Sequence, residues 1–358
     1  MAERKKKRFG WPTAIGIMVT IPILWWSVRD IHFAQVLEHF REARKVPLLA
    51  AMAAVVLALP ARAARWRILL RNENPYLKVA PLYHATAIGF AINNLLPART
   101  GEIARAYAAW RLTGARFSSA ITTIVLSRVL DGVTLFLILA LAALLGAFAT
   151  DFTIGGVTVG RIMSVATTIF VGLFAIVVIA MTFPTVVLGI FGKVSHTVLP
   201  DKWADRVGQG LKGILDSLAV LRNPHLFLRV MAWSAVIWII NGLSIYLGFI
   251  AFHLDVPWHG SYVVQSLVNF GLAIPSTPGF VGVFEALMRG SLTLYGVEAA
   301  AAVSFAVAYH FCSYAPTTLL GLWSLARSRI RMSEVQEEVQ ERVTVAVERL
   351  TGTFQSMG

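Results

Sequence analysis

The fold is decided by a polar stretch inside apolar sequence, Asn93-Asn94-Leu95-Leu96-Pro97-Ala98-Arg99-Thr100-Gly101-Glu102. Amides, a guanidinium and a carboxylate at membrane depth need partners or water, so by default they mark a functional site. A second stretch of this kind follows, Ile274-Pro275-Ser276-Thr277-Pro278-Gly279-Phe280-Val281-Gly282-Val283-Phe284-Glu285. In both stretches an apolar segment is followed by a break at proline. A helix that begins at a glycine and carries a glutamate then follows. We therefore expect two halves, each built about one broken helix.

The composition is that of an integral membrane protein. Of the 358 residues 57% are hydrophobic and 14% charged, with a mean hydropathy of +0.68, whereas soluble domains are about a quarter charged. Long apolar runs predict an all-α, polytopic helical bundle rather than an outer-membrane barrel. The single cysteine, Cys312, lies in an apolar run and predicts neither disulfides nor a cysteine metal cluster. No metal and no cofactor is expected.

The net charge of +13 has a membrane explanation. In a soluble chain it would suggest nucleic acid, but here the basic residues cluster between apolar segments, as the positive-inside rule describes. Predicted cytoplasmic segments hold 25 of the 32 lysines and arginines, and predicted outer segments hold six. We therefore expect a multi-pass protein of the cell (inner) membrane, with both termini cytoplasmic and no nucleic-acid partner.

Six full spans are predicted, at about residues 10–28, 46–61, 118–148, 162–183, 228–252 and 297–325. Two shorter apolar segments break at prolines and are predicted to form re-entrant hairpins. Residues 1–9 are a basic cytoplasmic N-terminus, 10–328 the membrane domain, and 329–358 a cytoplasmic tail helix. Residues 10–148 and 149–328 are predicted inverted repeats, an arrangement of secondary transporters that bind substrate near the midplane.

Two glycines, Gly101 and Gly279, are predicted to open helices after the breaks. The first N–H groups of a helix have no intrahelical acceptor, and this positive end suits a phosphate or carboxylate. Arg99 would add a bidentate cation to the first site. The alternative is that prolines and glycines only allow close packing, with Arg99 in the interfacial zone.

Two glutamates, Glu102 and Glu285, occupy corresponding places in the two half-helices. If the hairpins meet, these carboxylates would face one another, pair with Arg99 or Arg128, or carry a proton; structural ion pairing is the alternative. Arg128 and Asp131 share a helix face, either as a static pair or as part of a substrate path. Single polar residues are interpreted as interhelical hydrogen-bonding groups, namely His84, Asn241, Gln265, Asn269 and His310.

The predicted substrate-binding set contains no catalytic residue and comprises Asn93, Asn94, Pro97, Arg99, Gly101, Glu102, Arg128, Asp131, Pro275, Pro278, Gly279, Gly282 and Glu285. These motifs resemble the lysylphosphatidylglycerol synthase transmembrane, or flippase-like, family over about residues 10 to 328. In multidomain members such a membrane part moves an aminoacylated phospholipid between leaflets after a cytosolic domain has made it. The tail after residue 330 is too short for that aminoacyltransferase domain, so the resemblance implies a stand-alone, lipid-handling member.

The sequence thus favours a lipid flippase or transporter for an anionic phospholipid, glycolipid or polyprenyl-linked lipid. One alternative is an intramembrane lipid-phosphate phosphatase or transferase, with Glu102 or Asp131 as base; no activated nucleophile is apparent at useful spacing. Another is a non-catalytic membrane partner of a cytosolic lipid-modifying enzyme. The expected partners are the lipid substrate, such an enzyme, and a second copy of the chain.

Overall fold

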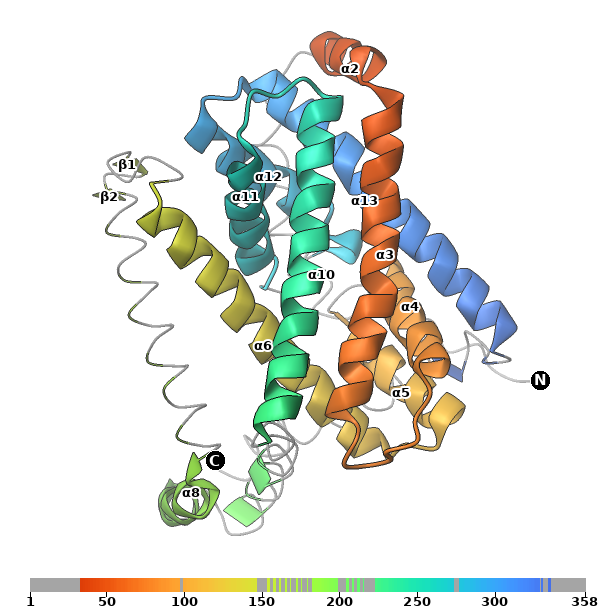
Figure 1. The fold of residues 1–358 in the computed structure, drawn as a ribbon, viewed down its shortest axis with the longest axis vertical. Coiled ribbons are helices and arrows are strands. Elements are labelled where there is room, and N and C mark those ends of the chain that lie inside the picture. Colours follow the sequence, from red (N-terminus) through yellow and green to blue (C-terminus); the bar gives the residue numbers. More distant parts are fainter. Residues whose placement is uncertain are drawn as a thin grey trace, which may run out of the picture.

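The computed structural model describes residues 33–96, 99–146, 223–273 and 277–328, residues 330, 334 and 335, and parts of 153–215. Figure 1 shows a bundle of helices. They are α2 (Phe33–Glu42), α3 (Lys45–Leu69), α4 (Val79–Leu95), α5 (Gly101–Thr113), α6 (Phe117–Leu144), α8 (Pro184–Val198), α10 (Pro224–Ala251), α11 (Trp258–Gly271), α12 (Val283–Leu292) and α13 (Ala299–Arg327). Two 3-10 turns, η2 (Pro278–Phe280) and η3 (Thr293–Tyr295), flank α12, and β1 (Thr153–Ile154) pairs antiparallel with β2 (Val157–Thr158).

Three of these helices, α3, α6 and α10, are long and apolar enough to cross a membrane. They confirm the prediction of an all-α membrane protein and lie at three of the predicted spans. The predicted span at 10–28 lies outside the described residues, and those at 162–183 and the tail at 329–358 lie largely outside them.

One predicted boundary is wrong. We expected a span to end near residue 61, but α3 continues to Leu69, so Arg62 and Arg65 lie within the helix and not in a loop. The side chain of Arg65 is only 3% exposed, and it forms an ion pair with Asp131 of α6. Because a buried carboxylate compensates its charge, this arginine has no need to leave the bundle.

The two broken segments form helix pairs, with α4 packed along α5 and α11 packed on α12. The first helix after a break begins at Gly101, as expected. The second begins at Val283 and not at Gly279, which is a correction to the prediction. Gly279 lies in η2 with a φ of 62°, and Gly282, with a φ of 86°, forms the N-cap of α12. Both backbone conformations favour glycine.

The first helix of each broken pair packs against a long helix of the other part of the chain, α4 against α13 and α11 against α6. The second helix of each pair packs against the long helix that follows it in its own part, α5 against α6 and α12 against α13. Helices α3 and α10, one from each part, pack against each other. Each of these contacts in one part thus has a counterpart in the other. The repeat boundary at residue 148 and the inversion of the second repeat stay predictions.

Small residues permit the closest of these contacts. A Cβ added at Gly321 of α13 would lie 2.3 Å from the carbonyl oxygen of Ala87 and 2.4 Å from the Cβ of Ala91, both on α4. Membrane helices commonly use such small residues to bring backbones together. The close approach fixes α4 against α13 and places the end of α4 near the second break.

Candidate functional site

A cavity of about 310 Å³ lies where helices of the two parts of the chain meet. Side chains of α3, α4, α5, α6, α10, α11, α12 and α13 line it, together with Arg99 from the first break and Phe280 from η2. The cavity brings together six of the predicted residues, Asn93, Asn94, Arg99, Glu102, Arg128 and Asp131. Its amide lining also includes Asn241, Gln265 and Asn269.

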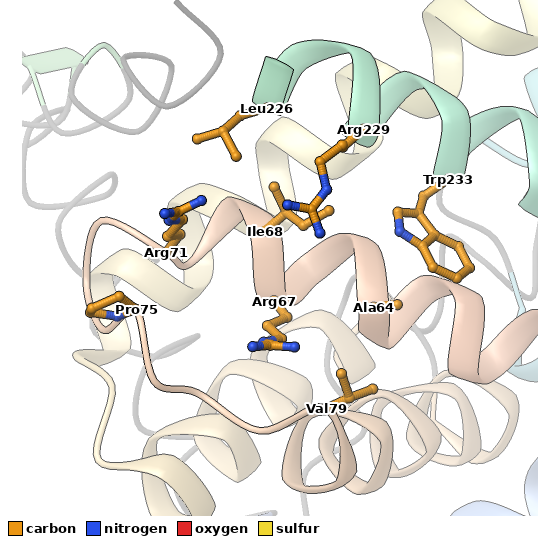
Figure 2. A pocket seen from close by; sticks show the side chains of 9 residues that line it. All are labelled: Ala64, Arg67, Ile68, Arg71, Pro75, Val79, Leu226, Arg229 and Trp233. Atoms are coloured by element: carbon orange, nitrogen blue, oxygen red, sulfur yellow. The ribbon is translucent and has the colours of Figure 1, made fainter. Parts of the chain in front are cut away.

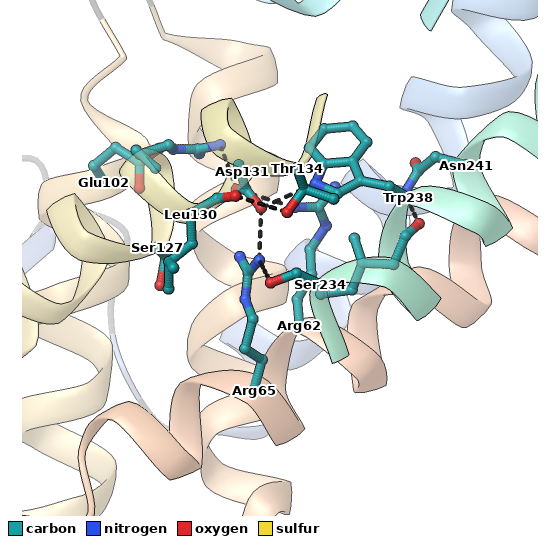
Figure 3. A network of polar contacts seen from close by, with 12 residues as sticks. Arg62, Arg65, Glu102, Ser127, Leu130, Asp131, Thr134, Ser234, Trp238 and Asn241 are labelled. Atoms are coloured by element: carbon teal, nitrogen blue, oxygen red, sulfur yellow. Dashed lines mark hydrogen bonds and ion pairs between the residues drawn. The ribbon is translucent and has the colours of Figure 1, made fainter. Parts of the chain in front are cut away.

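Asp131 is the centre of a polar network on α6 (Figure 3). Its Oδ1 accepts a hydrogen bond of 2.6 Å from Arg65 and one of 3.2 Å from the Trp238 indole. Its Oδ2 lies 3.8 Å from a guanidinium nitrogen of Arg62 and 3.8 Å from one of Arg128. The Asp131 side chain is 7% exposed. One buried carboxylate therefore compensates guanidinium groups from two helices.

Glu102 pairs with Arg128, so the structure selects one of the partners that the sequence left open. The Arg128 Nε donates to Glu102 Oε1 at 2.9 Å, and a second guanidinium nitrogen contacts the same oxygen. Arg128 is therefore shared between Glu102 and Asp131. Its side chain is 42% exposed, so this cation remains accessible from the cavity.

Two further arginines have incomplete hydrogen bonding. Arg99 adopts a positive φ of 55°, donates to the Leu272 carbonyl at the end of α11, and lies 5.7 Å from the Phe280 ring centroid. Arg105 is 6% exposed and lies 4.0 Å above the Trp66 ring. The Nε atoms of both arginines are buried and have no hydrogen-bond partner among the described residues. Such unpaired donors are costly in a protein interior.

The network carries a surplus of positive charge. Its two carboxylates, Glu102 and Asp131, stand against five guanidinium groups, those of Arg62, Arg65, Arg99, Arg105 and Arg128. Three positive charges are therefore uncompensated by the described residues of the network. Sequence reasoning missed Arg62, Arg65 and Arg105 because it counted them as loop cations. The available signal was the spacing of Arg62 and Arg65, which places both on one helix face.

The glycine ends of the half-helices are already occupied. Gly101 N–H donates to Asn93 Oδ1 at 2.8 Å, and a Cβ at Gly101 would lie 2.1 Å from the Gly89 carbonyl oxygen. Gly282 N–H donates to Glu285 Oε2 at 2.6 Å. The close-packing interpretation therefore describes Gly101. Anion binding in this cavity has to rest on guanidinium groups rather than on these amides.

Glu285 forms a buried dyad with His310 of α13 instead of facing Glu102. Glu285 Oε1 lies 2.6 Å from His310 Nδ1, and His310 Nε2 lies 2.8 Å from the Gly279 carbonyl oxygen. Because a carbonyl only accepts, Nε2 carries hydrogen, and the Nδ1 to carboxyl contact needs a hydrogen of its own. The dyad ties the second break to α13.

The two breaks meet at Asn94 and Gly279. A Cβ at Gly279 would lie 3.1 Å from the Asn94 carbonyl oxygen, and the Asn94 amide donates to Thr318 of α13 at 2.9 Å. Asn94 and Tyr314 also line an open groove of about 630 Å³, whose other walls are mostly apolar and include the dyad. Pro97 and Pro275 lie outside the described residues, and of Pro278 only the backbone is described, within η2.

The fold and the cavity define a helical membrane protein with a cationic cavity in its interior. The chain belongs to the family described as the lysylphosphatidylglycerol synthase TM region, whose profile matches residues 13–321. This match confirms the family that the broken-helix motifs predicted.

Curated relatives are similar at low identity. The chain is 25% identical over 352 residues to the glycosyltransferase AglD of Haloferax volcanii, with 91% of this chain and 56% of AglD covered. It is 23% identical over 320 residues to a UPF0104 membrane protein of Methanothermobacter thermautotrophicus, covering 86% and 93%. A UPF0104 membrane protein of Methanocaldococcus jannaschii is 25% identical over 234 residues, covering 64% and 91%. The chain thus spans little more than half of AglD.

Proposed function

We propose that this membrane protein binds the anionic head group of a lipid in its central cavity and moves that lipid between leaflets. The observation that carries the proposal is the charge surplus of the network, five guanidinium groups against two carboxylates, of which Arg62, Arg99 and Arg128 line the cavity. Uncompensated cations at membrane depth are costly, and an anionic ligand offsets that cost. Arginine is suited to this role because its fork matches the geometry of a phosphate.

The size of the cavity favours a head group over a whole lipid. Ligand pockets usually enclose about 300 to 1,000 Å³, so a cavity of about 310 Å³ suits a phosphate with a small substituent. The adjoining groove of about 630 Å³ is open and has apolar walls at Val307, Phe311 and Leu319. It would accommodate the first part of the acyl or prenyl chains while their ends remain in the bilayer.

In this proposal, the two broken helix pairs provide the movement that carries the lipid head group. Arg99 lies between the two hairpins, since its backbone belongs to the first break and its guanidinium contacts Leu272 and Phe280 of the second. Separation of the hairpins would release this guanidinium toward the cavity. Alternate opening toward the two leaflets would then carry the head group across the inner membrane.

The similarity to AglD adds a substrate class. That protein is named a glycosyltransferase, and this chain matches 56% of its length. Lipid-linked sugar phosphates therefore belong among the test substrates beside anionic phospholipids. A glycosyl or phosphoryl transfer by this chain would appear as a new product from a polyprenyl phosphate, and this provides the test of the enzymatic alternative.

The test uses purified protein in liposomes with labelled phosphatidylglycerol, and with labelled phosphatidylcholine as the zwitterionic comparison of zero net charge. We expect faster transbilayer movement of the anionic lipid, and its loss in Arg99→Gln and Arg128→Gln. Arg41→Gln is the matched control, because Arg41 is exposed on α2 and does not line the cavity. Equal movement of anionic lipid by wild type and Arg99→Gln would refute the proposal.

A further inference from the structure

A second pocket, of about 390 Å³, lies apart from the central cavity where α3 ends and α10 begins (Figure 2). Arg67 and Arg71 reach it from α3 and the loop after it, and Arg229 reaches it from the first turns of α10. Trp233 and Val79, at the start of α4, also line it. Three cations from segments far apart in the sequence therefore surround one space.

These three guanidinium groups differ from those arginines that pair with a carboxylate. Arg65 and Arg128 pair with carboxylates in the network, and Arg116 pairs with Glu73 at 2.8 Å. The side chains of Arg67, Arg71 and Arg229, in contrast, have no hydrogen bond or ion pair to any described residue, and no carboxylate is among the described residues lining the pocket. Like charges gathered without a counter-charge repel one another, so the arrangement favours a bound anion.

The lining also indicates which anion fits. Three guanidinium forks supply donors in the geometry that phosphate oxygens accept. Trp233 presents an amphipathic ring, as tryptophans do at the level of lipid head groups. We propose that this pocket is a second anion site, which binds the phosphate group of an anionic membrane lipid.

The position of this pocket suits the delivery of a lipid head group to the central cavity. Arg67 and Arg62 are five residues apart on α3, which is about 7.5 Å along a helix. Between them lies Arg65, whose guanidinium donates to Ser234, the neighbour of Trp233 on α10. Helix α3 thus carries arginines from the pocket to the cavity. The loading role rests on the proposed function, whereas phosphate binding at the pocket does not.

The test measures lipid binding to the purified full-length chain by native mass spectrometry, with phosphatidylglycerol and with phosphatidylcholine. We expect the triple variant Arg67→Gln/Arg71→Gln/Arg229→Gln to lose affinity for phosphatidylglycerol by at least about tenfold, as the removal of several charge-assisted hydrogen bonds implies. Phosphatidylcholine binding should stay unchanged. The matched control is Arg41→Gln/Lys45→Gln/Lys193→Gln, which removes the same charge at exposed positions away from the pocket.

The source of the phosphate group and the folding of the variant are controlled separately. Displacement of bound phosphatidylglycerol by millimolar inorganic phosphate supports phosphate recognition. Binding of inorganic phosphate without binding of phosphatidylglycerol overturns the lipid assignment. An unchanged melting curve shows that the triple variant folds. When Arg229→Lys takes the place of Arg229→Gln in this variant, part of the lost phosphatidylglycerol binding should return.

Failure of this proposal differs from failure of the transport proposal. Arg99→Gln alters the central cavity only, so it should leave binding at the α3 and α10 pocket intact. Phosphatidylglycerol affinities within about twofold for wild type, the triple variant and the charge control would overturn the second site. Intact binding at this pocket in a protein that moves no lipid would refute the transport proposal alone.

Discussion

Replacing Asp131 by asparagine tests whether one carboxylate keeps the central network stable. The substitution preserves the size of the side chain and an oxygen that can accept from the Trp238 indole, now 3.2 Å away. It removes the negative charge that lies 2.6 Å from Arg65 and 3.8 Å from both Arg62 and Arg128. Buried cations are then left without their compensating charge.

The expected cost follows from burial. The Arg65 and Asp131 side chains are 3% and 7% exposed, and breaking a buried pair by removing one partner costs about 3–5 kcal/mol. That corresponds to a change of about a hundredfold to a few thousandfold in the unfolding equilibrium constant. The pair of Glu73 with Arg116 provides the contrast, because the Arg116 side chain is 77% exposed and the Glu73 side chain is 14% exposed. Its loss should cost less than the loss of the buried pair, because water can solvate the Arg116 guanidinium.

The assay is equilibrium unfolding in detergent micelles, comparing Asp131→Asn with the matched surface variant Glu73→Gln. Arg65→Met in the Asp131→Asn background should restore part of the stability, because it removes the guanidinium left unpaired. If Asp131→Asn costs no more than Glu73→Gln, water rather than Asp131 compensates these arginines. The charge surplus would then give little reason for anion binding.

Three further predictions concern the breaks and the surface. Gly101→Ala should destabilise the protein by about 1–3 kcal/mol or more through overpacking, whereas Gly290→Ala, with open space around it, should be neutral or stabilising in thermal unfolding. Glu285→Gln should keep most of the stability because its amide can donate to the imidazole, and Glu285→Leu should lose about 1–3 kcal/mol in the same measurement. The hydrogen bonds from Arg116 lower the pKa of Glu73 from 4.5 to about 2. The stabilisation by this depressed pKa is present above pH 4.5 and lost as the pH falls toward 2, so the stability difference between wild type and Glu73→Gln should vanish there.

The positions of helices were predictable because hydrophobic length is local information. The predictions at 118–148 and 228–252 match α6 and α10, since the apolar runs there are long and contain no proline. The end of α3 was not predictable in the same way. A hydropathy reading ends a span at Arg62, but the carboxylate that lets α3 continue lies on α6, and Asp131 is 66 residues from Arg65. The sequence contains both partners without indicating that they meet.

The breaks illustrate the same distinction. The prolines and glycines of the sequence predicted the positions of the breaks. Which backbone N–H groups remain unbonded at the helix ends depends on contacts that residue spacing does not encode. Asn93, eight residues before Gly101, fills the first helix end, and Glu285 fills the second from within its own first turn. The second of these was accessible to sequence reasoning, because a glutamate three residues after an N-cap commonly bonds back to it.

The packing of each broken pair against a long helix of the other part explains why the two breaks are coupled although their chemistry differs. Near the first break lie the arginines of the cavity, whereas the second break carries the Glu285 and His310 dyad. Helix α13 contacts both breaks. Its Thr318 hydroxyl accepts a hydrogen bond from the Asn94 amide, and its His310 imidazole contacts the Gly279 carbonyl oxygen. A displacement of α13 therefore alters the first break and the second together. In the proposed transport cycle, the position of the second break and occupancy of the cavity would then influence one another through this helix.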